Sequence, residues 1–274
     1  MPPLATQIWS ITMNLNGKTA IITAGASGIG RVIAERYTEL GASVCLCDVD
    51  AQAMEDVKKA LPDALVVKAD VSSSREIAAF YDAFLKKHAR LDILVNNAGV
   101  SGPTKPVEEV TDEEWDQTMA VNVTGQFYMV RQAVPLFKQA GGGCIINLSS
   151  VAGRVGMPLR APYSTSKYAV RGLTDVLAVE LGEINVRVNA ILPGLVDGPR
   201  GQRVMREQAE KRGMTLEEFM PYFLHNISMH TAVSMKEIAD MAAFLASDLA
   251  PHVSGQSISV DGNFETYRGP KMAS

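Results

Sequence analysis

A tyrosine and a lysine four residues apart, Tyr163 and Lys167, form the pair with the clearest chemical potential in this sequence. In an α-helix this spacing places both side chains on one face. A tyrosine hydroxyl at its reference pKa of about 10 is a poor base near neutrality, but a nearby ammonium group favours the phenolate. Tyr163 would then act as a general acid/base toward a carbonyl oxygen. The same spacing occurs by chance in many helices, so other residues must support this interpretation.

Two serines, Ser149 and Ser150, provide the first support. They directly follow an apolar run at residues 144–148, which predicts a strand, and Ser150 precedes Tyr163 by thirteen residues. In open α/β sheets, ligands bind outside the carboxyl ends of the strands. We therefore expect Ser150 and Tyr163 to share a site at that edge, with Ser149 as a structural neighbour.

A glycine-rich turn, Thr23-Ala24-Gly25-Ala26-Ser27-Gly28-Ile29-Gly30, follows the first predicted strand and leads into a helix. Glycines at such a turn let the backbone approach a pyrophosphate, which the N–H groups of the helix N-terminus can hold. A glycine cluster alone is weak evidence. Its position, and the acidic residue that ends the second predicted strand, make it stronger.

That acidic residue is Asp48, which follows Val44-Cys45-Leu46-Cys47. A carboxylate at this place can accept hydrogen bonds from both hydroxyls of an adenosine ribose, and it repels a 2′-phosphate. The turn offers Ser27 and no arginine or lysine to bind that phosphate. The sequence therefore favours NAD over NADP as the cofactor.

Elements that could position these residues alternate along the chain. Strands are expected at residues 19–23, 43–47, 64–68, 91–95, 144–148, 186–192 and 257–260. Helices are expected at 28–40, after Asp50, around 77–85, from Thr111 through Phe127, at 163–181 and after Ser234, with capping-box patterns at Thr111/Glu114 and Ser234/Glu237. This alternation implies right-handed crossovers and a parallel sheet covered on both faces. We predict a single α/β domain over residues 1–274, with a doubly wound, mainly parallel seven-stranded, Rossmann-like sheet.

One segment, residues 197–231, interrupts the alternation. It is polar and amphipathic and lies between the sixth predicted strand and the last helix. We expect it to form a lid over a ligand cleft.

The combined pattern resembles the short-chain dehydrogenase/reductase family in its single-domain form, from Gly17 to Gly262. The motifs that carry the likeness are the glycine turn, Asp70-Val71, Asn96-Asn97-Ala98-Gly99, Asn122, Ser150, the Tyr163/Lys167 pair and Pro193-Gly194. The resemblance implies that Tyr163 transfers a proton, Ser150 binds the substrate oxygen and Lys167 holds the nicotinamide ribose and lowers the tyrosine pKa. It also implies that Asn122 holds a water molecule in a proton relay. Cofactor contacts are implied for Gly25, Ser27, Gly28, Ile29, Asp48, Asp70, Val71, Asn97, Ala98, Gly99, Tyr163, Lys167, Pro193 and Val196.

Two positions depart from the family pattern. The family usually has glycine where this chain has Ala24, and here Gly25 comes one residue later. It also commonly has threonine where this chain has Gly198, at the carboxamide of the cofactor. The first departure affects the geometry expected at the pyrophosphate, and the second leaves the carboxamide contact to a backbone group or water.

The composition excludes several other classes of protein. A net charge of −4 without a polybasic stretch gives no case for nucleic-acid binding, and no apolar run is long enough to span a membrane. The four histidines lack metal-binding spacing, and Cys45, Cys47 and Cys144 are interpreted as reduced core residues. We see no signal peptide and expect a cytoplasmic enzyme with no metal.

Four arginines fall in segments that should border the cleft: Arg154, Arg160, Arg200 and Arg203. Guanidinium groups bind carboxylate, sulfonate or phosphate through paired hydrogen bonds. One hypothesis is a small anionic hydroxy or keto substrate. The alternative is that all four are solvated or pair with acids such as Asp197 and Glu207.

These observations predict an NAD-dependent oxidoreductase that interconverts a secondary alcohol and a ketone. Two alternatives remain: a cofactor-binding sensor or scaffold without turnover, and an epimerase or dehydratase that uses NAD transiently. The resemblance further implies a homotetramer, with the helices from Thr111 and from Tyr163 at one two-fold interface and the segment near Phe264 at another.

Overall fold

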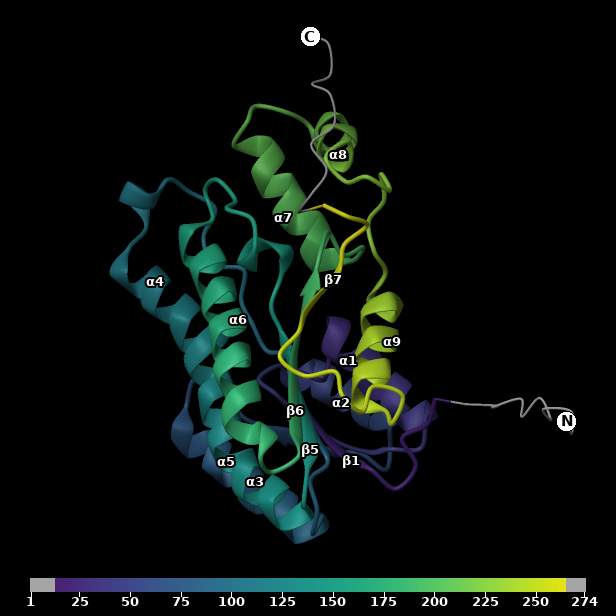
Figure 1. Cartoon of the computed structure of the whole chain (residues 1–274). Coiled ribbons are helices and arrows are strands. Elements are labelled where there is room, and N and C mark those ends of the chain that lie inside the picture. The colour runs from purple at the N-terminus through teal and green to yellow at the C-terminus, as the bar shows by residue number, and fades with distance from the viewer. Residues whose placement is uncertain (1–12, 265–274) are drawn as a thin grey trace, which may run out of the picture.

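The computed structural model describes residues 13–264, and its centre is one seven-stranded sheet (Figure 1). All neighbouring strands are parallel, in the order β3-β2-β1-β4-β5-β6-β7, with β1 (Thr19–Thr23), β2 (Ser43–Asp48), β3 (Leu65–Lys68), β4 (Ile93–Asn96), β5 (Gly143–Leu148), β6 (Val186–Pro193) and β7 (Ser257–Val260). The order reverses between β1 and β4, which creates the switch point where such sheets bind ligands. The prediction of a single-domain, doubly wound, Rossmann-like fold is confirmed.

Helices connect the strands and cover both faces: α1 (Gly28–Glu39), α2 (Ala51–Ala60), α3 (Ser74–Lys87), α4 (Asp112–Met119), α5 (Gly125–Ala140), α6 (Ala161–Gly182), α7 (Pro199–Glu210), α8 (Leu216–Leu224) and α9 (Met235–Ala246). Short 3₁₀ turns lie at η1 (Val107–Glu109) and η3 (Val151–Gly153). None of the helices within residues 13–264 is long and apolar enough to cross a membrane.

Alternation along the strands divides the apolar residues between two cores. Ile22 and Leu46 pack with α1, α2 and α9, whereas Ile21 and Cys45 point to the opposite face and pack with α3, α5 and α6. This is the period-two pattern of a strand that is buried on both sides. All three cysteines are buried free thiols, as predicted.

The helix predicted from Thr111 through Phe127 is interrupted. It starts with the expected capping box between Thr111 and Glu114, but α4 ends at Met119 and a π-helical turn, η2 (Ala120–Thr124), precedes α5. The prediction of one continuous helix was wrong because hydrophobic spacing does not register a single wider turn. Such turns are frequent at functional sites, and this one contains Asn122.

Residues 197–231 form mainly helices α7 and α8, which lie beyond the carboxyl end of the sheet (Figure 1). They enclose a small core of their own around Met205, Ala209 and Phe219. The two ends of the segment are joined by a bridge between Val196 and Val233. The segment is therefore a substructure with a small core of its own, whose two ends lie side by side.

Candidate active site

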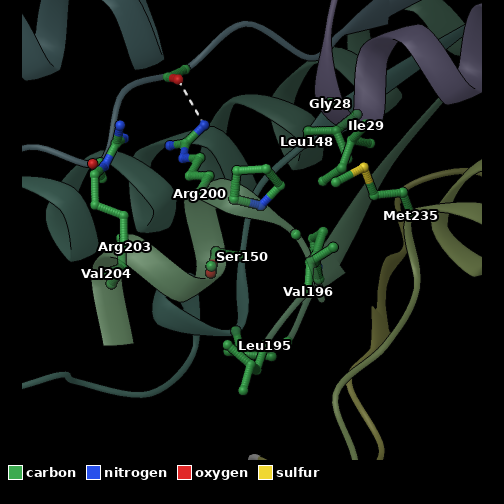
Figure 2. Close-up of a pocket in the computed structure, with 18 of the residues that line it drawn as sticks. Gly28, Ile29, Leu148, Ser150, Leu195, Val196, Arg200, Arg203, Val204 and Met235 are labelled. Carbon is green, nitrogen blue, oxygen red and sulfur yellow. Dashed lines mark hydrogen bonds between the residues drawn. The ribbon is translucent and has the colours of Figure 1, made fainter. Parts of the chain in front are cut away.

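A cavity of 710 Å³ opens at the carboxyl ends of β1, β4, β5 and β6, in the size range of small-ligand sites. Its walls also include the first turn of α1, one side of α7 and Met235 of α9 (Figure 2). The predicted site residues that line it are Ser27, Gly28, Ile29, Asn97, Gly99, Ser150, Arg160, Tyr163, Lys167, Pro193, Val196, Arg200 and Arg203. Those that do not are Gly25, Asp48, Asp70, Val71, Ala98, Asn122 and Arg154.

Tyr163 and Lys167 lie on the first turns of α6, as the spacing predicted. The buried Lys167 ammonium donates a hydrogen bond to the Leu148 carbonyl at 2.7 Å and lies 5.7 Å from the centre of the Tyr163 ring. Burial raises the pKa of Tyr163, but the charges of Lys167, Arg200 and Arg160 and a hydrogen bond with Ser150 outweigh it, so the pKa is lowered. Burial also lowers the pKa of Lys167. This arrangement suits a phenol that exchanges a proton near neutral pH.

The two serines after β5 have different roles. Ser149 donates from its hydroxyl to the Lys167 carbonyl at 2.8 Å and so ties β5 to α6. The Ser150 hydroxyl lines the cavity and accepts a hydrogen bond from the Ala152 N–H at 3.1 Å, which fixes its direction. Ser150 is therefore the serine placed to meet a ligand oxygen beside Tyr163.

Asn122 sits behind the cavity wall, not in it. Its Oδ1 accepts from the Val100 N–H at 2.7 Å, and its Nδ2 donates to the Val100 carbonyl at 3.0 Å and to the Ser166 hydroxyl at 2.9 Å. Both amide hydrogens are thus used by protein groups. The side chain anchors the loop after β4, and a relay water would have to use other groups of this residue.

The glycine turn after β1 is built for close approach of the backbone. A Cβ atom on Gly30 would lie 2.2 Å from the Ala24 carbonyl oxygen and 2.5 Å from Asn97 Nδ2. Gly28 has a φ of +55° with open space at its Cβ position. The Ser27 side chain makes no capping hydrogen bond at the start of α1. The N–H groups in the first turn of that helix therefore remain available to a ligand. These features fit the pyrophosphate of a dinucleotide.

Ala24, the first departure from the family pattern, adopts a φ of +48°. This left-handed region favours glycine. The turn therefore keeps the conformation that glycine would take, and Asn97 stabilises it by donating from Nδ2 to the Thr23 and Ala24 carbonyls at 3.0 and 3.1 Å. Ala98 contributes its N–H, which donates to the Thr23 hydroxyl at 2.9 Å.

The residues predicted for the adenosine half lie at the ends of β2 and β3, outside the cavity. The buried Asp48 accepts from the Ala26 N–H at 3.0 Å through Oδ2 and from the Val49 and Asp50 N–H groups through Oδ1. These bonds use three of the roughly four acceptor positions of a carboxylate. Room therefore remains for about one strong hydrogen bond from a ribose.

Asp70 and Val71 are occupied by protein contacts. The Asp70 carboxylate accepts from the N–H and hydroxyl of Ser72 at 2.9 and 2.7 Å. Val71 is buried and packs so closely that a Cβ atom on Gly125 would lie 2.9 Å from its methyl group. Neither residue lines the cavity, and both side chains are engaged with other protein groups.

Sequence reasoning missed Met235. The methyl carbon of Met235 lies 2.3 Å from the position that a Cβ atom would take on Gly198, where the family commonly has threonine. The methionine enters the cavity from α9, within the wall that also contains Gly28, Ile29 and Val196 (Figure 2). Spacing in the sequence could not reveal this contact, because it joins residues from two distant elements.

The four arginines separate into two groups. Arg160, Arg200 and Arg203 line the cavity, whereas Arg154 donates to the Ser257 carbonyl at 2.8 Å and to the Ser259 hydroxyl at 3.3 Å on β7. Arg154 is thereby removed from the candidates for substrate binding. Arg200 donates to the Gly99 carbonyl at 2.9 Å, and Arg203 lies 4.0 Å from Glu207.

Comparisons with known proteins agree with this geometry. Residues 23–264 match the family model described as enoyl-(acyl carrier protein) reductase. The chain is 36% identical to 3beta-hydroxysteroid dehydrogenase 2 of Eggerthella lenta, over 92% of this chain and 96% of that protein. It is 34% identical to D-beta-hydroxybutyrate dehydrogenase of Rhizobium meliloti, over 90% and 98% of the two chains.

Solved structures give the same result. The crystal structure of levodione reductase superposes with a TM-score of 0.85 at 30% identity, covering 91% of this chain and 98% of that one. NAD+-bound xylitol dehydrogenase superposes with a TM-score of 0.86 at 29% identity, covering 90% and 98%. Ketoreductases solved with NADPH and with NADH are also among the similar structures. With its switch-point cavity, its glycine turn and its tyrosine–lysine pair, the chain belongs to the short-chain dehydrogenase/reductase family.

Proposed function

We propose that this oxidoreductase interconverts a secondary alcohol and a ketone with NAD, and that Tyr163 is its general acid/base. The observation that carries the proposal is the partly buried phenol, its pKa lowered by neighbouring cations, beside Ser150 in the cavity. Relatives named as hydroxysteroid, hydroxybutyrate and xylitol dehydrogenases and as levodione reductase act on substrates of this general kind.

The nicotinamide, when bound, supplies the hydride acceptor or donor, and the protein supplies the proton transfer and the positions. Ser150 donates to or accepts from the substrate oxygen and holds it next to Tyr163. In alcohol oxidation the Tyr163 phenolate takes the hydroxyl proton, and in ketone reduction the phenol returns one. Lys167 keeps the phenolate accessible near neutral pH through its charge.

An initial-rate assay tests this activity. The enzyme is supplied with NAD and a panel of secondary alcohols, sugars, hydroxy acids and steroids, and NADH absorbance is followed. Net NADH formation supports a dehydrogenase and excludes both a sensor without turnover and an epimerase or dehydratase that regenerates its cofactor. NADH binding without turnover of any alcohol or ketone would instead favour one of those alternatives.

The preference for NAD over NADP rests on Asp48. Its buried carboxylate, held by three backbone N–H groups, places a fixed negative charge at the end of β2, where it repels a 2′-phosphate. Similar structures contain NAD(H) or NADPH, so family membership alone does not determine the cofactor. Asp48→Asn should narrow the ratio of kcat/KM for NAD over NADP about 10- to 100-fold. The neighbouring Asp50→Asn, which removes a charge but keeps a side-chain oxygen to cap α2, should leave the ratio unchanged.

The segment at residues 197–231 is proposed as a substrate lid. It contributes Arg200, Arg203, Val204 and Met205 to the cavity and carries its own small core. Its contacts with the loop after β4 include the hydrogen bond from Arg200 to Gly99 and one from Thr104 to Glu207 at 3.2 Å. Near its C-terminal end, Ser228 and Met229 also bond to Gly262, so the proposed opening would pivot there and break the contacts of α7 with the loop after β4.

A homotetramer is proposed for the assembly. Large apolar side chains are exposed on the outer faces of the helices expected at a two-fold interface: Trp115, Phe127, Tyr168, Val176 and Val179. Phe264 stacks on Phe223 of α8 with ring centres 5.4 Å apart, next to the expected second interface. Sedimentation equilibrium tests the proposal, and a stable, active monomer would refute it. The cytoplasmic location stays a prediction.

A further inference from the structure

Arg160 is a buried cation in the cavity wall. Its side chain directly precedes α6, is only 3% exposed and stacks its guanidinium carbon 4.7 Å from the centre of the Tyr163 ring. It donates to the Ser101 carbonyl at 2.8 Å and to the Thr104 hydroxyl at 3.3 Å, both neutral groups. Its Nε is buried and has no hydrogen-bond partner within residues 13–264. The buried guanidinium therefore has an unused donor at Nε.

Within residues 13–264, no carboxylate lies within ion-pair distance of this guanidinium. The Tyr163 phenolate, when it forms, and Glu207 attract Arg160 electrostatically, but Oε2 of Glu207 accepts from the Thr104 hydroxyl, which thus stands between Arg160 and that carboxylate. Burial lowers the pKa of Arg160, which reflects the poor solvation of the cation. Buried charges are normally paired, because an unpaired one is costly. A ligand with a negative group would satisfy this side chain.

Other cations converge on the same region. Arg200 and Lys167 both influence the Tyr163 phenol, and Arg200 and Arg160 repel each other. Arg200 uses one nitrogen to hold the Gly99 carbonyl and extends from α7 into the cavity (Figure 2). The one carboxylate that lines the cavity within the described chain, Glu35, is paired with Arg31 at 2.8 Å on α1. The catalytic end is thus positive without a balancing acid in its wall.

We propose that the cavity contains a carboxylate subsite between Arg160 and Arg200, and that the substrate is a short hydroxy or keto acid. The inference rests on the proposed function, because the hydroxyl or carbonyl is taken to lie at Tyr163 and Ser150. The guanidinium of Arg160 stacks on the ring of Tyr163, so the carboxylate and the reacting carbon are separated by only a few bonds. Arg160 is the fixed member of the subsite and Arg200, on the proposed lid, is the member that arrives with closure.

A binding experiment tests the subsite without any turnover. Unreactive carboxylates from acetate to hexanoate, and their neutral primary amides, are titrated into the enzyme–NADH complex, and NADH fluorescence is followed. At least one carboxylate should bind more tightly than its amide. Arg200→Met and Arg160→Met should each weaken that carboxylate about 10- to 150-fold and leave the amide unchanged.

Arg206→Met is the matched control, because Arg206 lies on the same helix but is exposed and does not line the cavity. It should leave carboxylate binding unchanged. If Arg160→Met does not fold, the exposed Arg200→Met carries the test alone. Equal binding of acids and amides, or equal losses in the Arg200 and Arg206 variants, would overturn the subsite.

A kinetic experiment separates this inference from the proposed function. Secondary hydroxy acids of three to six carbons are compared with their primary amides as substrates, with NAD as the oxidant. A higher kcat/KM for the acid that is lost in Arg200→Met supports the subsite. Oxidation of neutral alcohols in preference to every acid overturns the substrate class while the oxidoreductase remains. Carboxylate binding without any turnover supports the subsite and overturns the proposed function.

Discussion

The sheet edge and the α7–α8 segment form two opposite walls of one cavity, and they are built differently. The groups at the sheet edge are buried and tied by short hydrogen bonds, such as Lys167 to the Leu148 carbonyl. Helices α7 and α8 pack mainly on each other, around Met205 and Phe219, and expose most of their polar surface. Chemistry that needs fixed distances lies on the sheet wall, and the proposed lid adds Arg200 and Arg203 from the other side.

The largest expected effect comes from the rigid wall. Tyr163→Phe should lower kcat about 10²- to 10⁴-fold, the usual contribution of a general acid/base, while NADH affinity changes little. Stopped-flow turnover and NADH fluorescence titration measure the two quantities. Retention of more than about a tenth of the activity would show that another group moves the proton.

Matched truncations compare the two cores directly. Phe137→Ala removes a fully buried ring from the sheet core and should cost about 3–5 kcal/mol, which lowers Tm by roughly 10 °C. Phe219→Ala removes an equally buried ring from the α7–α8 core. If that core opens independently, Phe219→Ala should shift Tm by less than about 3 °C and raise KM for the substrate.

Calorimetry and steady-state kinetics on both variants measure these effects. Similar losses of Tm in the two variants would mean that the α7–α8 segment unfolds together with the sheet. The distinction between a rigid and a movable wall would then be wrong.

A smaller effect is expected in the pH profile of alcohol oxidation. The phenolate is the base, so kcat/KM should rise with pH as Tyr163 loses its proton. Burial opposes ionisation, but the Lys167 charge and the other cations lower the pKa of Tyr163 overall. Lys167→Met should therefore move the rising limb to higher pH. If the rising limb of the Lys167→Met profile, measured at saturating NAD, stays at the same pH, that limb does not reflect the ionisation of Tyr163.

The smallest effect is expected at the turn after β1. Ala24 adopts a left-handed φ that is strained for alanine and not for glycine. Ala24→Gly should therefore raise the free energy of unfolding by about 0.5–1 kcal/mol, a net value that includes the greater flexibility of glycine in the unfolded chain. Ala26→Gly, two residues on and without a positive φ, should instead destabilise by a similar amount. Urea unfolding measures both. A loss of stability in Ala24→Gly would show that the turn is not strained.

Much of the rigid wall was predictable because its signals are local. The strand at 19–23 and the capping boxes at Thr111 and Ser234 follow from neighbouring residues, and the structure confirms them. The π-turn at Asn122 was missed, because one inserted residue leaves the apolar spacing almost unchanged.

Contacts that join distant segments were less predictable. Arg154 and Arg160 occupy the same loop, and nothing in their spacing tells which one enters the cavity. Arg154 reaches β7, while Arg160 turns inward at the start of α6. The Met235 side chain beside Gly198 likewise depends on how α9 approaches the end of β6.

The bridge between Val196 and Val233 has a consequence for variation in this family. The Asp197 N–H donates to the Val233 carbonyl, and the Val233 N–H donates to the Leu195 carbonyl. The chain therefore enters and leaves the segment through two adjacent stretches that are hydrogen-bonded to each other. Residues added to or removed from the segment beyond this bridge change the loop-closure entropy only a little and do not alter the register of β6. We therefore expect insertions, deletions or grafts between these two valines to change the substrate specificity and to leave the catalytic residues in place.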